Sequence, residues 1–284
     1  MNKIHLVECP RDAMQGWKNF ISTEKKVQYI NALLKVGFDT LDMASFVSAK
    51  AIPQMADSKD VVEKISLENT NTKLLAIVAN LRGAAEAVNF YKLSYLGYPF
   101  SISPTFQLRN ANSTIEDSLI TVEKIQELCR KNNKELVVYI SMAFGNPYGD
   151  EYNEDIVLKW VNALSKLNIK IVSIADTVGL ATQPQITSIF KKLISIYPEI
   201  SFGVHLHSSV TNWKNKIDAA LQAGCKRFDG ALNGIGGCPM ADDELVGNIN
   251  TELMIPYFEE QNILPVINKD ALKHALILAD KIFV

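Results

Sequence analysis

Two histidines, His205 and His207, stand two residues apart in the apolar run 201–207. In an extended strand, residues at this spacing point to the same face, about 6–7 Å apart along the chain. Two imidazoles at that separation can bind one metal ion between them. The alternative is a pair of hydrogen-bonded histidines in the core or at its rim. The chain has four histidines in all, and the placement of these two at the end of a predicted strand favours metal binding.

Arg11 and Asp12 join a cation to a carboxylate directly after the first apolar run. The carboxylate can bind a metal or accept a proton, and the guanidinium can stabilise an oxyanion. A surface ion pair of little energetic value is the alternative. Asn248 would add an amide oxygen to the ligands. Imidazole and oxygen ligands without a cysteine cluster favour Mg²⁺ or Mn²⁺, with Zn²⁺, Co²⁺ or Fe²⁺ as further candidates.

A glycine-rich segment, Gly234-Ile235-Gly236-Gly237-Cys238-Pro239, carries a thiol. Glycines let a loop approach a ligand and close over it. Cys238 could then serve as an acid or base if its pKa is tuned. An ordinary turn with an unreactive cysteine is the alternative.

These residues need a frame that brings them together, and the chain supplies a repeating one. Eight short apolar runs, rich in Val, Ile and Leu, alternate with longer stretches of helical period. The expected strands are Ile4–Cys9, Thr40–Ser45, Lys73–Ala79, Pro99–Ser103, Leu136–Phe144, Ile171–Asp176, Ser201–His207 and Arg227–Leu232. Strand–helix alternation of this kind predicts an α/β fold, a (β/α)₈ TIM barrel with a C-terminal helical extension. We expect residues 1–284 to form a single catalytic domain.

The helical stretches carry start and stop signals. Expected helices are Ser22–Val36, Ile115–Lys131 with a Ser113 or Thr114 cap, Asn153–Leu167, Gln183–Ile196 and Trp213–Ala223. A doubly wound open sheet is the competing fold. Its dinucleotide-binding turn, G-x-G-x-x-G after the first strand, is absent because that position reads CPRDAMQG.

A barrel active site lies at the carboxyl ends of the strands. Polar residues lie in or directly after most of the predicted strands, among them Asp42 and Ser45 in the second, Thr177 after the sixth and Asp229 in the eighth. Each is ambiguous alone, but their common location predicts a site. Gln15, Ser45 and Thr177, with Arg11, are the expected substrate-binding residues.

The composition narrows the functional class. With 48% hydrophobic residues, 21% charged residues and a net charge of −2, the chain is not expected to bind nucleic acid. No uninterrupted apolar stretch reaches the roughly 18 residues of a membrane span, and no signal peptide is evident. The four cysteines lack CxxC spacing, so we expect free thiols in a reducing cytoplasm.

The motifs, taken in order, resemble the 3-hydroxy-3-methylglutaryl-CoA lyase family. This family belongs to the metal-dependent barrel superfamily that also contains isopropylmalate and homocitrate synthases. The resemblance covers nearly the whole chain. It is carried by CPRDAMQ at 9–15, ASFVSAKAIPQMAD at 44–57, YISMAFGNPYGD at 139–150, SIADTVGLATQP at 173–184, GVHLHSS at 203–209 and GIGGCPMADDELVGNINTE at 234–252.

The resemblance implies metal-assisted cleavage of 3-hydroxy-3-methylglutaryl-CoA to acetyl-CoA and acetoacetate. By position, the implied metal ligands are Asp12, His205, His207 and Asn248. Arg11 is the implied stabiliser of the acetyl-CoA enolate, and Cys238 the implied participant in proton transfer to it. Asp12 and His205 are both candidates for the base that accepts the hydroxyl proton. Asp42 occupies the place of a family glutamate and is the fifth expected catalytic residue.

The chain departs from the family pattern at several positions. Cys9 replaces a glycine, Glu8 stands one place later than the family glutamate, and Ser208 replaces the aspartate after H-x-H. The segment from Cys238 to Asn248 is one residue longer than usual and is acidic at 242–244. These changes leave the metal ligands intact, but they leave open which related 3-hydroxyacyl-CoA is the substrate.

Two other functions remain open. One is a Claisen condensation of acetyl-CoA with a 2-oxo acid, as in the synthases, although those carry regions for which 284 residues leave no room. The other is a catalytically silent barrel that acts as a scaffold. An acyl-CoA substrate is the expected partner, and a homodimer is expected by analogy with other barrels.

Overall fold

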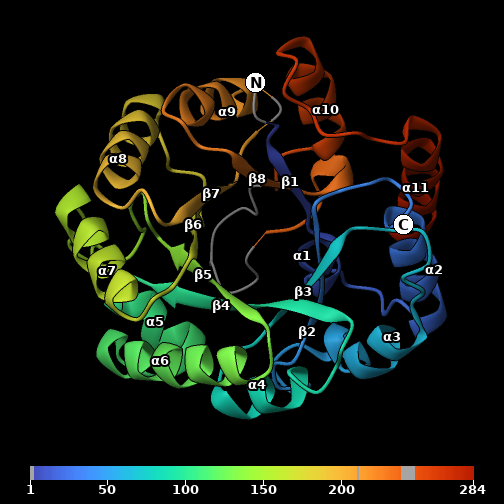
Figure 1. Cartoon of the computed structure of the whole chain (residues 1–284), viewed down its shortest axis with the longest axis horizontal. Coiled ribbons are helices and arrows are strands. Elements are labelled where there is room, and N and C mark those ends of the chain that lie inside the picture. The colour runs from blue at the N-terminus through green and yellow to red at the C-terminus, as the bar shows by residue number, and fades with distance from the viewer. Residues whose placement is uncertain (1–2, 210, 238–246) are drawn as a thin grey trace.

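Eight parallel strands form a closed barrel in the computed structural model, which describes residues 3–209, 211–237 and 247–284. The strands follow one another in sequence order, and β1 pairs with β8 to close the ring (Figure 1). They are β1 His5–Glu8, β2 Thr40–Ser45, β3 Lys73–Ile77, β4 Leu93–Ser101, β5 Glu135–Ser141, β6 Ile171–Asp176, β7 Ser201–Leu206 and β8 Arg227–Gly230. The predicted barrel is therefore confirmed, and the open sheet is excluded.

Helices surround the barrel, and two more extend the chain after β8 (Figure 1). They are α1 Pro10–Gln15, α2 Thr23–Leu33, α3 Ser58–Lys64, α4 Leu81–Ala87, α5 Pro104–Ala111, α6 Ile115–Lys131, α7 Glu154–Lys166, α8 Gln183–Ile196, α9 Trp213–Gln222, α10 Thr251–Glu260 and α11 Lys269–Ile282. The short 3₁₀ helices Pro53–Met55 and Leu232–Gly234 lie in loops. α10 and α11 form the predicted C-terminal helical extension. None of the helices described is long and apolar enough to cross a membrane.

Most strand boundaries lie within three residues of those predicted. β2 and β6 have the predicted bounds, whereas β4 begins six residues before the predicted Pro99. Gly97 interrupts the apolar pattern there because Ile77 of the neighbouring strand fills the space of a side chain: a Cβ at Gly97 would lie 2.6 Å from its Cδ1. β5 ends at Ser141 rather than Phe144, since Met142 has a positive φ of 60° and leaves the extended conformation.

Helix starts follow their capping residues. The Ser22 side chain accepts a hydrogen bond from the Lys25 N–H, and the Thr114 side chain accepts one from the Asp117 N–H. Such caps satisfy backbone donors that the first turn leaves without partners and contribute about 1 kcal/mol each. They confirm the predicted beginnings of α2 and α6.

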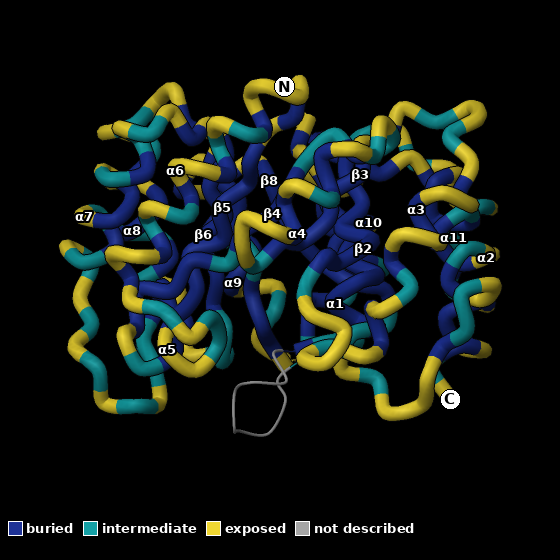
Figure 2. The backbone as a smooth tube through the Cα atoms, turned by 90° about the horizontal axis from the view of Figure 1, so that it is seen from below, coloured by how far each residue is buried: buried dark blue, intermediate teal, exposed yellow. Residues whose placement is uncertain are grey.

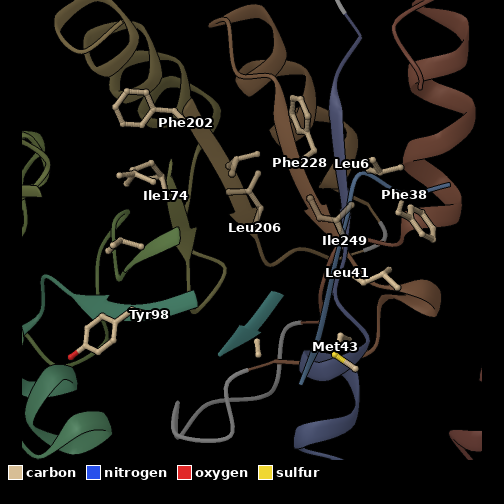
Figure 3. Packing of buried hydrophobic residues seen from close by; sticks show 14 of the residues in the cluster. Leu6, Phe38, Leu41, Met43, Tyr98, Ile174, Phe202, Leu206, Phe228 and Ile249 are labelled. Carbon is tan, nitrogen blue, oxygen red and sulfur yellow. The ribbon is translucent and has the colours of Figure 1, made fainter. Parts of the chain in front are cut away.

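The main core lies between the barrel strands and the surrounding helices, where buried residues concentrate (Figure 2). Side chains from several strands meet there, among them Leu6, Ile174, Phe202 and Phe228 (Figure 3). Phe228 also packs on Phe258 of α10, with ring centroids 4.9 Å apart. Burial of each such aromatic side chain contributes about 1.5–3 kcal/mol. The core holds the strands rigidly and so holds the residues at their carboxyl ends.

A second apolar cluster consists of Leu75, Ile77, Val137, Tyr139 and Ile171, from β3, β5 and β6. It is separate from the main core. By strand alternation these side chains face the inside of the barrel. These side chains make one part of the barrel interior largely apolar, with the hydroxyl groups of Tyr139 and Ser173 buried among them.

Candidate active site

The structure brings Asp12, His205 and His207 together at the carboxyl ends of β1 and β7. One potential ligand atom from each lies within 4.8 Å of the other two, and Asp12 and His207 are buried. The two imidazoles project from the same face of β7, with ring centroids 5.3 Å apart. Asp12 reaches them from α1, which begins directly after β1 because Pro10 is favourable at a helix start. The predicted pairing of the histidines on one face is confirmed.

Asp229 orients His205 from the neighbouring strand β8. His205 Nδ1 lies 3.3 Å from Asp229 Oδ2, and the Tyr139 ring packs edge-on against the imidazole. When Nδ1–H donates to this carboxylate, Nε2 is left as a ligand atom. Burial lowers the pKa of His205, but the hydrogen bond and the charges of Asp229 and Asp12 outweigh burial and raise it. Asp229 is among the polar residues expected at the strand ends, but its contact with His205 was not predicted.

Three donors surround the Asp12 carboxylate. Arg11 Nη1 and Gln15 Nε2 donate to Oδ1 at 3.1 and 3.0 Å, and Asn248 Nδ2 donates to Oδ2 at 2.6 Å. Burial raises the pKa of Asp12, but the charge of Arg11 and the nearby imidazoles outweigh it and lower the pKa. Asp12 is thus held as a carboxylate, the form that can bind a hard cation or accept a proton.

Asn248 lies beside His207 through a bridge between their backbones. Its amide nitrogen faces Asp12, so coordination of an ion by its amide oxygen requires the amide to rotate by half a turn. Gly236 packs over the same contact: with φ of +126°, a Cβ there would lie 2.2 Å from Asn248 Nδ2. Any side chain at that position would displace Asn248. The structure confirms that Asn248 is near Asp12, and its role as a ligand stays a prediction.

Arg11 is held by Asp42 of β2. Its Nε and Nη2 both donate to that carboxylate, Nη2 at 2.5 Å from Oδ2. Arg11 is buried, and its pKa is raised because the two aspartates outweigh the effect of burial. The bonds to Asp42 and Asp12 use three of the five guanidinium N–H groups. Two donors remain for an oxyanion. Asp42 is 1% exposed and contacts Arg11, so the contacts assign it a positioning role.

The expected substrate-binding residues have partners of their own. Gln15 donates to Asp12, and Thr177 Oγ1 accepts a hydrogen bond of 2.9 Å from Met142 N. The backbone N–H of Ser45 donates to Ser58 Oγ at 3.1 Å. Gln15 and Thr177 therefore support neighbouring groups at the mouth, and substrate binding by these residues stays a prediction. Cys238 lies outside the described residues.

Cys9 is a group at the site for which sequence reasoning supplied no role. Its sulfur, a nitrogen of His205 and an oxygen of Asp229 also lie within 4.8 Å of one another. Burial and the surrounding carboxylates raise the pKa of the Cys9 thiol well above its usual value. The thiol is therefore neutral, and it lies near the His205 imidazole. Cys9 directly follows β1, so strand alternation continued by one residue, from Val7 to Cys9, was the available signal.

The charges of the site fit a divalent cation. Asp12, Asp42 and Asp229 are buried with Arg11, and Arg227, two residues before Asp229 on β8, is buried as well. Three carboxylates against two guanidinium groups leave a formal charge of minus one when the imidazoles are neutral. Buried charge that is not compensated is costly. A divalent cation between Asp12, His205 and His207 would compensate it, and the donor types are those of Mg²⁺, Mn²⁺ or Zn²⁺ sites.

Comparison with known proteins gives consistent results. A family model described as HMGL-like matches residues 4–278. The hydroxymethylglutaryl-CoA lyase YngG of Bacillus subtilis is 31% identical over 254 residues, which are 89% of this chain and 84% of that protein. The cytoplasmic 3-hydroxy-3-methylglutaryl-CoA lyase of Danio rerio is 31% identical over 88% of this chain and 74% of its own length.

A solved structure is similar throughout the fold. The HMG-CoA lyase of Acinetobacter baumannii, in complex with coenzyme A and 3-methylmalate, superposes with a TM-score of 0.91 at 30% identity. The match covers 99% of this chain and 91% of that one. The similarity therefore extends over the barrel and its C-terminal extension.

Proposed function

The chain belongs to the HMGL-like family, and from this premise we propose that it is a divalent-metal-dependent carbon–carbon lyase. The substrate is 3-hydroxy-3-methylglutaryl-CoA or a close 3-hydroxyacyl-CoA, and the products are acetyl-CoA and acetoacetate or its homologue. The names of the relatives support this reaction. The coenzyme A in the Acinetobacter structure supports an acyl-CoA ligand.

The observation that carries the proposal is the convergence of Asp12, His205 and His207 within 4.8 Å beside the Arg11 guanidinium. A cation site and an oxyanion site next to each other are what this cleavage requires. Asp12, His205 and His207 would hold the metal, with the Asn248 oxygen as the proposed fourth ligand. We propose Mg²⁺ or Mn²⁺ because one carboxylate and an amide oxygen accompany the imidazoles.

The reaction begins with removal of the proton from the C3 hydroxyl of the substrate. When bound, the divalent cation supplies Lewis acidity that lowers the pKa of that hydroxyl. Asp12 and His205 are the candidate proton acceptors because both lie at the site. The electron pair of the O–H bond forms the new C3 carbonyl, and the C2–C3 bond breaks. Its electrons move to the thioester as an enolate.

Arg11 stabilises the enolate oxygen with the two N–H groups that its aspartate partners leave available. Asp42 fixes the plane of the guanidinium, so these donors are oriented before the charge develops. The enolate carbon then takes a proton and becomes the methyl group of acetyl-CoA. Cys238 is the proposed participant in this last transfer, on the strength of the family motif alone.

The experiment is a product assay with purified protein and Mn²⁺ or Mg²⁺. A panel of 3-hydroxyacyl-CoA thioesters is incubated with the protein, and acetyl-CoA and the ketone product are measured by mass spectrometry. We expect equal amounts of both products from the preferred thioester and none after chelation. A second arm offers acetyl-CoA and 2-oxo acids and measures free coenzyme A. Condensation there without cleavage in the first arm would overturn the proposal in favour of a synthase.

Three further predictions accompany this function. We propose that residues 1–284 act as one catalytic domain and that the protein is a homodimer. We also propose a cytoplasmic location, as the name of the Danio rerio relative states for that enzyme. Sedimentation and cell fractionation test the last two.

A further inference from the structure

Lys216 lies on α9, outside the set of residues expected from the sequence, yet its ammonium group is buried near the mouth of the barrel. The residue is 3% exposed. Its Nζ donates to Asp176 Oδ2 at 2.7 Å, to the Gly179 carbonyl at 3.0 Å and to the His207 carbonyl at 2.9 Å. These acceptors come from the end of β6, the turn after it and the residue that follows β7.

An ammonium group has three N–H donors, and these three acceptors account for all of them. Lys216 therefore has no donor left for a substrate, which excludes direct binding through hydrogen bonds. Its contacts instead tie together two strand ends. Asp176, 1% exposed, extends the connection, because its other oxygen accepts a hydrogen bond from Ala181 N at 3.1 Å.

We propose that Lys216 is a positioning residue for the metal site and acts through the backbone of His207. The backbone dihedrals of residue 207 set the direction of its imidazole, and the bond from Lys216 fixes the carbonyl that those dihedrals move. The backbone of Asn248 forms a bridge with that of His207, so a shift of this peptide would move two proposed ligands together. The inference rests on the metal site of the proposed function.

The charge on Lys216 has a separate, structural effect. It neutralises the buried Asp176 carboxylate at 2.7 Å. Removal of the lysine alone would leave that carboxylate buried and unpaired, which strongly destabilises comparable pairs. Loss of stability is thus expected from any simple truncation, and stability alone cannot reveal positioning.

Two variants separate the effects. Lys216→Met removes the charge and all three bonds. The double variant Lys216→Met/Asp176→Asn also removes the stranded carboxylate, so it should recover thermal stability without restoring the bond to His207. Lys134→Met is the control: Lys134 lies at the opposite end of the barrel and donates to two carbonyls, those of Phe90 and Leu93, at 2.9 and 2.7 Å.

The measurement is Mn²⁺ binding to metal-free protein by isothermal titration calorimetry, with the melting temperature of the metal-free form recorded alongside. We expect both Lys216 variants to bind Mn²⁺ about 10–100-fold more weakly, the usual effect of losing a group that orients a ligand. Lys134→Met should bind like the wild type. If Lys216→Met does not fold, the double variant carries the test.

Wild-type Mn²⁺ affinity in the double variant would overturn the inference, as would an equal loss in Lys134→Met. In either case wild-type lyase activity would leave the proposed function standing. A wild-type protein that binds no Mn²⁺ would instead overturn the metal-dependent function, and the inference with it.

Discussion

Replacement of Glu8 by glutamine should change how the stability of the protein depends on pH. Glu8 ends β1 and is fully buried. Its Oε1 accepts a hydrogen bond from Leu232 N at 2.8 Å, and its Oε2 lies 2.5 Å from Thr251 Oγ1. Burial, with a smaller effect of the charge of Glu252, raises its pKa from 4.5 to about 8 against the lowering effect of these bonds. The folded protein therefore holds this carboxyl as a neutral acid at neutral pH.

The sign of the effect follows from the number of protons bound. Between the unfolded pKa of 4.5 and the folded pKa of about 8, the folded state binds a proton at Glu8 that the unfolded state has released. The contribution of Glu8 to the stability of the folded state is thus fully present below pH 4.5 and is lost as the pH rises through about 8. Each pH unit within that window is worth about 1.4 kcal/mol, so the loss from about pH 5.5 to 8.5 is about 3 kcal/mol.

Glutamine is a neutral copy of the protonated acid. Its oxygen can accept the Leu232 N–H, and its amide can donate to the Thr251 hydroxyl, so the contacts survive. We expect the free energy of unfolding of Glu8→Gln, relative to that of the wild type, to rise by about 3 kcal/mol between about pH 5.5 and 8.5. The other titrating groups are common to both proteins and cancel in this difference. Urea unfolding of both proteins at several pH values measures this difference. A difference that stays constant with pH, or that favours the wild type as pH rises, would refute the reasoning.

Three further variants address the site itself. Arg11→Lys keeps the charge but loses the planar guanidinium that binds both Asp42 and the oxyanion, so kcat should fall about 100-fold. The retained charge should limit the change in melting temperature. His205→Ala should weaken Mn²⁺ binding, and unchanged affinity and stoichiometry in calorimetry would remove it from the ligands. Asp229→Asn keeps the size of the side chain but weakens the orientation of His205. It should reduce Mn²⁺ affinity about 10–100-fold in equilibrium dialysis, and a value equal to the wild type would contradict that role.

Much of the fold was predictable because local and long-range preferences agree in this chain. β2, β6, α6 and α8 have the predicted bounds. β4 was placed too late because its first half is shaped by packing against β3, where Ile77 occupies the space beside Gly97. When a side chain of one strand fills the space of a missing side chain on its neighbour, the apolar pattern of the neighbour is broken. The sequence of that segment then does not indicate a strand.

The site was predictable to the extent that it depends on strand ends. Alternation placed His205 and His207 on one face, and the barrel brought Asp12 to them. Contacts between side chains were not predictable, because they depend on the register of neighbouring strands. The bond from His205 to Asp229 requires β7 and β8 to pair as they do. Lys216 was missed since a lysine on an amphipathic helix is usually exposed.

The distribution of charge inside the barrel explains why the chemistry occurs on one side of it. Leu75, Val137 and Ile171 fill the side formed by β3, β5 and β6, and they can neither hydrate nor pair with an ion. The ionisable side chains come from β7, β8, β2 and the segment after β1. Burial of Arg11 and the carboxylates limits screening by water, so their mutual interactions are stronger than at a surface. The same burial makes uncompensated charge costly, and a cation bound by Asp12, as proposed, would therefore contribute to folding as well as to catalysis.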